Sequence, residues 1–210
     1  MANEKLRRQI AFEAARLMYQ RTESEYYRAK MKAARKVCRD WVKPSELPAN
    51  SEIRDQIQQF ARMHEGETRD ENLCEMRLEA LKLMRLLRPF RPRLIGSTLT
   101  GHVRRGSDID IHVFSNSLEA VLGVLMNEGI VYDVQHKHVH KNNEDRIYTH
   151  IHIPDRFTFE LTLYAEDQHP IVMKSSVTGK PIERASIAEL EQFLEREYPE
   201  LDLEESLLDL

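Results

Sequence analysis

Asp108 and Asp110 are separated by a single residue in the segment RLIGSTLTGHVRRGSDIDIHVF (93–114). Side chains two residues apart in a β-strand point to the same side, so a strand here places both carboxylates and His112 on one face. The Ile and Val residues that alternate with them then form an apolar face. Neighbouring carboxylates repel each other unless a cation or solvent relieves the repulsion. Because Mg²⁺ binds one or two acids together with substrate phosphates, the pair predicts a site for Mg²⁺ or Mn²⁺.

A glycine-serine turn, Gly96 and Ser97, precedes the acids, with ten residues between Ser97 and Asp108. Glycine lets the backbone approach a ligand closely, and a serine at the start of a helix offers a hydroxyl and an amide to phosphate oxygens. Arg104, Arg105 and Ser107 lie in the loop before the first acid and add donors for a polyphosphate. A phosphate-binding turn beside a metal-binding acid pair is typical of phosphoryl or nucleotidyl transfer.

A third acid, Glu160, lies in the predicted strand 157–164, where apolar residues alternate with polar ones. It is the only acid on the polar side of that strand, which makes it the best candidate for a third metal ligand. We therefore expect the catalytic and metal-binding acids to be Asp108, Asp110 and Glu160.

Histidines also gather in the predicted strands. If KNNED (141–145) closes a hairpin centred near Asn143, His136 faces His150, and if PDR (154–156) closes the next hairpin, His150 faces Glu160. The four histidines of this possible cleft are His112, His136, His150 and His152. The alternative is that they are polar strand edges in a solvated cleft. A zinc site built from them has no recognised ligand spacing.

The elements that must position these residues follow in order along the chain. Helical periodicity predicts one or two helices over 5–42, then helices over 52–63 and 69–88, separated by a proline-containing break at 43–50. Strand and turn patterns follow, with predicted strands at 93–95, 109–114, 130–140, 146–153 and 157–164. Ser117 and Ser186 are expected to cap two further helices. The order is a helical region (1–90), a mixed α/β unit (91–170), and a loop with an acidic helical tail (171–210).

Composition favours a globular protein, since 41% of the 210 residues are hydrophobic and 31% are charged. We expect a cytoplasmic protein without membrane contact, because the sequence shows no long apolar run and no signal-peptide pattern. Two cysteines far apart give little support to a disulfide framework. Segment 28–43 is basic and segment 183–210 is acidic. These segments are either two solvated faces or, for the basic one, a surface for RNA or a phosphorylated partner.

The spacing of Gly96-Ser97 and Asp108-Ile109-Asp110, with Gly101 and Ser107 between, resembles the signature of the DNA polymerase β-like nucleotidyltransferase superfamily. The resemblance covers roughly 93–114 and is greatest to its small bacterial members, which include minimal nucleotidyltransferases and the aminoglycoside and lincosamide enzymes. It implies an α+β fold, with a mixed-sheet nucleotidyltransferase core at 91–170 and helices on one face.

The same resemblance implies a nucleoside triphosphate substrate, with ATP as the expected source of AMP, and two Mg²⁺ ions. Asp108 and Asp110 would bind both metals, Glu160 would bind one of them and activate the acceptor hydroxyl, and Gly96 and Ser97 would hold the triphosphate. The chain departs from the pattern at the third acid, which is often Asp in relatives and lies some fifty residues after the pair here.

The acceptor is open between a small molecule, a protein and RNA. An antitoxin-type protein adenylyltransferase, an enzyme acting on RNA ends and an inactive nucleotide-binding homologue are the alternatives within the family, and a helical scaffold is the alternative outside it. A homodimer is also possible.

Overall fold

The computed structural model describes residues 2–38, 41–141 and 144–208. The chain packs as two compact units. The first comprises Met1–Arg69 with the short segments Val103–Arg105 and Lys174–Pro181, and the second comprises Asp70–His102, Gly106–Met173 and Ile182–Leu210. Residues 70–90, which we expected in the helical region, therefore pack with the sheet, as does the C-terminal tail.

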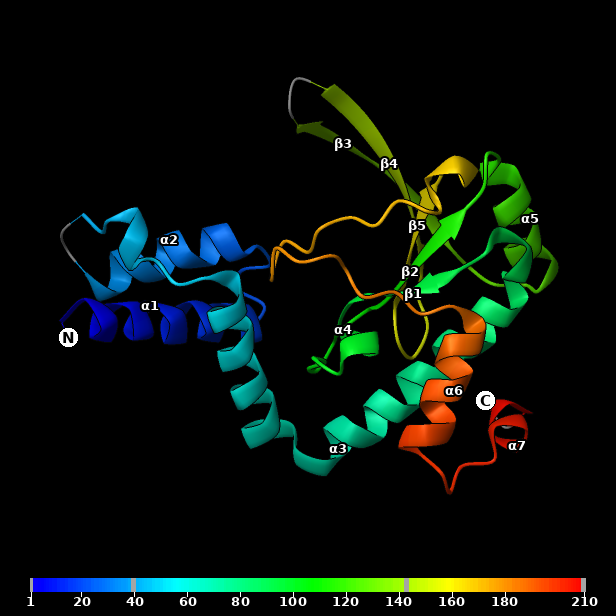
Figure 1. Cartoon of the computed structure of the whole chain (residues 1–210), viewed down its shortest axis with the longest axis horizontal. Coiled ribbons are helices and arrows are strands. Elements are labelled where there is room, and N and C mark those ends of the chain that lie inside the picture. Colours follow the sequence, from blue (N-terminus) through cyan, green and yellow to red (C-terminus); the bar gives the residue numbers. More distant parts are fainter. Residues whose placement is uncertain (1, 39–40, 142–143, 209–210) are drawn as a thin grey trace. The chain divides into compact units, whose positions relative to one another are not determined.

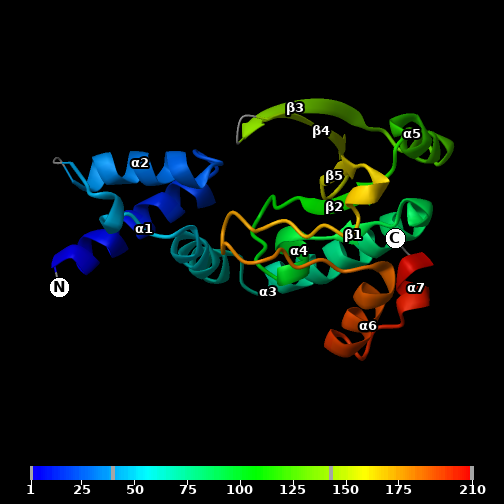
Figure 2. The same ribbon diagram turned by 45° about the horizontal axis from the view of Figure 1, so that its top comes forward.

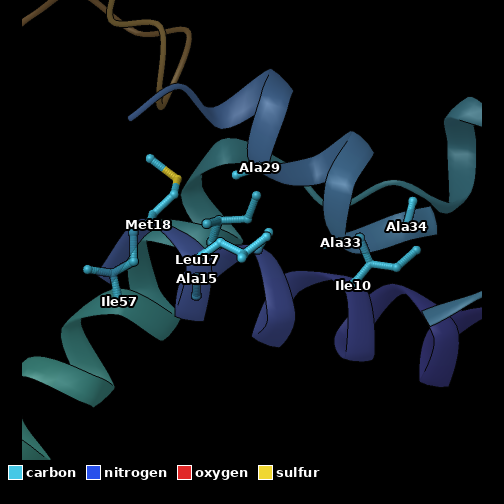
Figure 3. Packing of buried hydrophobic residues seen from close by; sticks show 10 residues of the cluster. Ile10, Ala15, Leu17, Met18, Ala29, Ala33, Ala34 and Ile57 are labelled. Atoms are coloured by element: carbon cyan, nitrogen blue, oxygen red, sulfur yellow. The ribbon is translucent and has the colours of Figure 1, made fainter. Parts of the chain in front are cut away.

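The first unit is helical. It contains α1 (Ala2–Tyr19), α2 (Tyr26–Val37), the short 3₁₀ helix η1 (Pro44–Glu46) and the first part of α3 (Asn50–Leu86). The core between these helices uses small residues, with Ala33 of α2 beside Ile10 of α1 and Ala29 beside Leu17 (Figure 3). Both alanines and Ile10 are fully buried. Alanines four residues apart lie on the same helix face, and their small side chains let α1 and α2 pack closely.

Helix α3 is interrupted at Gly66, whose φ of 55° and ψ of −136° are not helical. A positive φ is accessible to glycine at little cost, so the chain changes direction there. The two predicted helices, 52–63 and 69–88, correspond to the parts of α3 before and after this residue.

The second unit is built on a five-stranded sheet in the order β1-β2-β5-β4-β3. The strands are β1 (Arg93–Leu94), β2 (Ile109–Phe114), β3 (Asp133–Lys141), β4 (Glu144–Ile153) and β5 (Phe159–Tyr164). Only β2 and β5 pair in parallel, while the other neighbours are antiparallel. The chain is thus an α+β protein with a mixed sheet, as predicted at this level (Figure 1).

The second unit also contains the last part of α3, the 3₁₀ helices η2 (Arg88–Phe90) and η3 (Glu166–Gln168), and further α-helices. They include α4 (Gly96–Thr100), α5 (Leu118–Asn127), α6 (Ile187–Glu197) and α7 (Leu203–Leu208). The predicted caps are confirmed: the Ser117 hydroxyl accepts from the Ala120 amide, and Ser186 forms a capping box with Glu189.

Arg77 of α3 fixes the position of α4. Its buried guanidinium donates to the carbonyl of Thr98 at 3.0 Å and to the Tyr198 hydroxyl at 2.9 Å, and it stacks 4.5 Å over the Phe193 ring of α6. One cation therefore ties α3, α4 and α6 together, and α6 runs beside the last part of α3 (Figure 2).

One face of the sheet is apolar at its centre. Ile109 and Ile111 of β2, Leu161 of β5 and Ile151 of β4 are completely buried on it. The opposite face carries the polar residues that alternate with them. No helix in the part of the chain that the structure describes is long and apolar enough to cross a membrane.

Candidate active site

The polar face of the sheet brings together acids from two strands. The parallel register places Asp110 of β2 directly beside Glu160 of β5, and the antiparallel register places His152 of β4 on the other side of Glu160. The next row along the strands consists of His112, Thr162 and His150. Strand parity alone predicted that Asp110 and Glu160 share a face, and the register agrees with it.

The ionised form of the Asp110 carboxyl is disfavoured by its surroundings. Burial, and then the charges of Glu160 and Asp108, raise its pKa to about 7, while Lys137 acts in the opposite direction. A carboxylate here is costly because water is partly excluded and two further acids repel its charge. The site therefore holds a proton near neutral pH or gains from a bound cation.

Gly96 lies against the Asp110 side chain, at a position where only glycine fits. A Cβ built on Gly96 would overlap a carboxylate oxygen of Asp110 and lie only 3.2 Å from its Cγ, and the φ of Gly96 is 70°. Both the space and the backbone angle exclude a larger residue. The turn is held against β2, since the Ile95 amide donates to the Asp110 carbonyl at 3.0 Å and the Thr98 hydroxyl donates to the Asp108 carbonyl at 3.4 Å.

Ser97 lies in the first turn of α4, and its carbonyl accepts from the His102 amide at 3.0 Å. Ser107 belongs to the same unit as this turn. Arg104 and Arg105, by contrast, belong to the first unit, where their charges lower the pKa of Tyr19 against the stronger raising effect of burial and of Glu65. The roles proposed for these residues in nucleotide binding stay predictions.

Glu160 is paired with a lysine and a histidine from two neighbouring strands. Its Oε1 accepts from Lys137 Nζ of β3 at 3.3 Å and contacts His150 Nδ1 of β4. Burial by itself would raise the pKa of Glu160, but the charges of Lys137, His150 and His152 outweigh it and hold the pKa below its usual range. Lys137 was not among the predicted site residues. It lies two residues from Gln135, the partner of His150, so strand parity, which places it on the polar side of the sheet, was the available signal.

The histidine cluster is smaller than expected. His136 pairs with Thr149, and its Nδ1 lies 3.1 Å from the Thr149 hydroxyl, so the prediction that it faces His150 is wrong. The predicted hairpin centre lies outside the described residues, but Lys141 pairs with Glu144, which shifts the register by one residue. Such a shift moves a side chain to the opposite face.

The prediction that His150 faces Glu160 is also wrong by two residues. His152 is the direct neighbour of Glu160, while His150 faces Thr162 and reaches Glu160 diagonally. Parity is unchanged by a shift of two, so His150 and His152 both stay on the polar face, with their rings stacked 6.3 Å apart. His112 is buried on the same face and contacts the Tyr164 ring edge-on at 4.7 Å.

The acids have the donor chemistry that Mg²⁺ prefers. Asp110 and Glu160 offer hard oxygen ligands on adjacent strands, and their mutual repulsion is relieved by a divalent cation. Within the described residues, no three His, Cys, Asp or Glu side chains stand together as a ready metal-binding group.

The arrangement defines a class of site: carboxylates on the polar face of a mixed sheet, next to a glycine turn that opens a short helix. Such a site can bind a cation and an anionic ligand side by side. In comparisons with known proteins, the chain matches no family model, no curated protein and no solved structure.

Proposed function

We propose that this protein is a metal-dependent nucleotidyltransferase that transfers a nucleoside monophosphate, AMP from ATP, to a hydroxyl of an acceptor. One observation carries the proposal: Asp110 and Glu160 lie side by side on adjacent strands, and Gly96 makes room for the Asp110 carboxylate. The resemblance of 93–114 to the DNA polymerase β-like superfamily supports it, and a nucleotidyltransferase fold is part of the same proposal.

In this proposal, Asp108, Asp110 and Glu160 are the residues that would hold Mg²⁺ or Mn²⁺. A metal held by these residues would supply charge neutralisation to the triphosphate and the leaving pyrophosphate. Gly96 lets the triphosphate approach the backbone beside Asp110, and Ser97 offers donors at the start of α4. Glu160 is ionised at neutral pH, because its cationic neighbours lower its pKa, and can therefore accept a hydrogen bond from the acceptor hydroxyl.

The test is a titration of each nucleoside triphosphate into the protein by calorimetry, with Mg²⁺ and with EDTA. We expect Mg²⁺-dependent binding that is lost in the double variant Asp108→Asn/Asp110→Asn. The matched control is Asp167→Asn, which removes one exposed carboxylate from η3 in the same unit. Mg²⁺-dependent binding that survives the double change would overturn the assignment of the metal pair.

The structure bears on one alternative, an RNA acceptor bound by the basic helix α2. Three of its cations are paired with acids of the first unit: Lys36 with Glu13 at 2.7 Å, Lys32 with Glu23 at 3.0 Å, and Arg28 with Glu25 at 3.6 Å. These pairs reduce the positive charge that the helix presents to RNA, and the acceptor site is better sought on the sheet.

A further inference from the structure

A pocket of about 620 Å³ opens on the same sheet face as the acids. Its walls come from the ends of three strands and from the segment after η3. The main lining residues are His112, Phe114, Tyr148, Tyr164, Ile171 and Met173. A volume of this size is typical of small-molecule sites.

The pocket is aromatic and uncharged. The Tyr164 ring lies 4.7 Å from the ring of His112, 5.9 Å from that of Phe114 and 6.1 Å from that of Tyr148, measured between centroids. Among the described residues that line it, none is Asp, Glu, Lys or Arg. These walls favour a flat, uncharged ring over a polycation.

The pocket and α4 lie on opposite sides of the acids along the strands. The Thr98 hydroxyl of α4 bonds at the level of Asp108, whereas Phe114 lies four residues beyond Asp110. Each strand residue advances roughly 3.3 Å, which places the pocket about 7–13 Å from the acids. Figure 1 shows α4 near the start of β2 and the segment containing η3 near its end.

This order matters because the attacking and leaving oxygens of a phosphoryl-group transfer lie roughly in line. If the turn at Gly96 and Ser97 holds the triphosphate, the pyrophosphate leaves toward α4. The attacking hydroxyl then comes from the other side of the acids, which is the side of the aromatic pocket.

We propose that this pocket binds the acceptor, and that the acceptor is a small molecule with an uncharged, planar ring system and a hydroxyl group. This inference rests on the proposed function. The acceptor oxygen forms a bond to the α-phosphorus of the triphosphate, and the bond from that phosphorus to the β-bridging oxygen breaks. Pyrophosphate leaves with the bond electrons, and the hydroxyl proton passes to the carboxylate of Glu160. The ring stacks against Tyr164, and Gln168 at the pocket wall offers an amide to its polar edge.

Two neighbouring exposed residues provide a matched pair of variants. Ile171 lines the pocket and is 61% exposed, while Val172 does not line it and is 44% exposed. Ile171→Glu and Val172→Glu each add one carboxylate at an exposed position, so neither is expected to unfold the protein. Only the first places a charge at the pocket wall.

The first measurement uses 2-naphthol as a neutral planar probe and detects its binding to the full chain by saturation-transfer NMR, without nucleotide. We expect binding to wild type and to Val172→Glu, and at least tenfold weaker binding to Ile171→Glu. Equal binding to all three proteins would overturn the proposal. Displacement of the probe by adenosine would also overturn it, since the pocket would then hold the base of the donor nucleotide.

The second measurement is pyrophosphate release from ATP and Mg²⁺, in the presence of neutral aromatic alcohols or of a polycationic amino sugar. We expect the aromatic alcohols to stimulate release, with a KM at least tenfold higher in Ile171→Glu and unchanged affinity for Mg²⁺ and ATP. Greater stimulation by the amino sugar would contradict the assigned acceptor class. Loss of the nucleotide site itself is recognised separately, because it abolishes Mg²⁺-dependent ATP binding and leaves naphthol binding intact.

Discussion

Asp110 and His112 lie two residues apart on the same face of β2, yet burial acts on them in opposite directions. Burial and the neighbouring acids raise the pKa of Asp110 to about 7, whereas burial lowers the pKa of His112 to about 4. Both shifts disfavour the charged form, because partial removal of water penalises any charge. One end of the face is thus suited to take up a cation, and the other is suited to an uncharged ligand.

The largest expected effect that distinguishes the Asp110 end of this face from the His112 end is a change in the pH dependence of stability in the variant Asp110→Asn. The folded pKa of Asp110 is raised above the ordinary value of 3.8, so its contribution to stability is full below that value and is lost as the pH rises through 7. Between pH 5 and pH 8 the wild type should lose about 3 kcal/mol from this group, and the variant should not. Urea unfolding in EDTA at both pH values measures the difference. Parallel pH profiles of the two proteins would show that the pKa of Asp110 is not raised in the folded protein.

The second effect concerns the glycine turn. Gly96→Ala should lower the free energy of unfolding by about 2–3 kcal/mol, because a Cβ at a φ of 70° is strained and displaces the Asp110 carboxylate. It should also abolish Mg²⁺-dependent triphosphate binding. Gly123→Ala in α5 is the control, since a Cβ there meets nothing within 4 Å and alanine favours the helix. Thermal unfolding of both variants measures the difference. Equal stability of the two variants would contradict the close approach of Gly96 to the Asp110 carboxylate.

The third effect mirrors the first at the aromatic end. The folded pKa of His112 is lowered below its ordinary value of 6.5, so its contribution to stability is present above pH 6.5 and is lost as the pH falls toward 4. From pH 8 to pH 5 the wild type should lose about 2 kcal/mol from this group, in the direction opposite to Asp110. His112→Gln should remove that loss in the same urea experiment. A variant that is as acid-sensitive as the wild type would contradict a neutral, buried His112.

Sequence periodicity predicted the elements and the polar face of the sheet because both depend on local rules. In each of β2 and β5, apolar residues alternate with the acid, so the buried side of the strand is known from its own sequence. Asp110 and Glu160 are therefore assigned to the polar side without knowledge of the hairpin lengths, provided that the strand partners are correct. The register depends on turn length, and a shift of one residue removed His136 from the cluster.

The pocket and the cation on Glu160 were not predictable in this way. Tyr148, Tyr164 and Lys137 come from three different strands, and only the order β2-β5-β4-β3 brings them beside the acids. That order depends on long-range pairing, including the parallel pair of β2 and β5, which no local pattern specifies. The parity of these residues was visible in the sequence, but their neighbours were not.

The smallest expected effect concerns Lys137, whose ammonium lies 3.3 Å from Glu160 and competes with any metal for that carboxylate. Because the Lys137 side chain is half exposed, its charge is well screened, and Lys137→Gln should strengthen Mn²⁺ binding by only about fivefold, or about 1 kcal/mol. Electron paramagnetic resonance of Mn²⁺ without nucleotide measures this affinity. Lys82→Gln makes the same chemical change at an exposed position on α3 and should leave the affinity unchanged. Weaker Mn²⁺ binding in Lys137→Gln would mean that Lys137 positions Glu160 for the cation instead of competing with it.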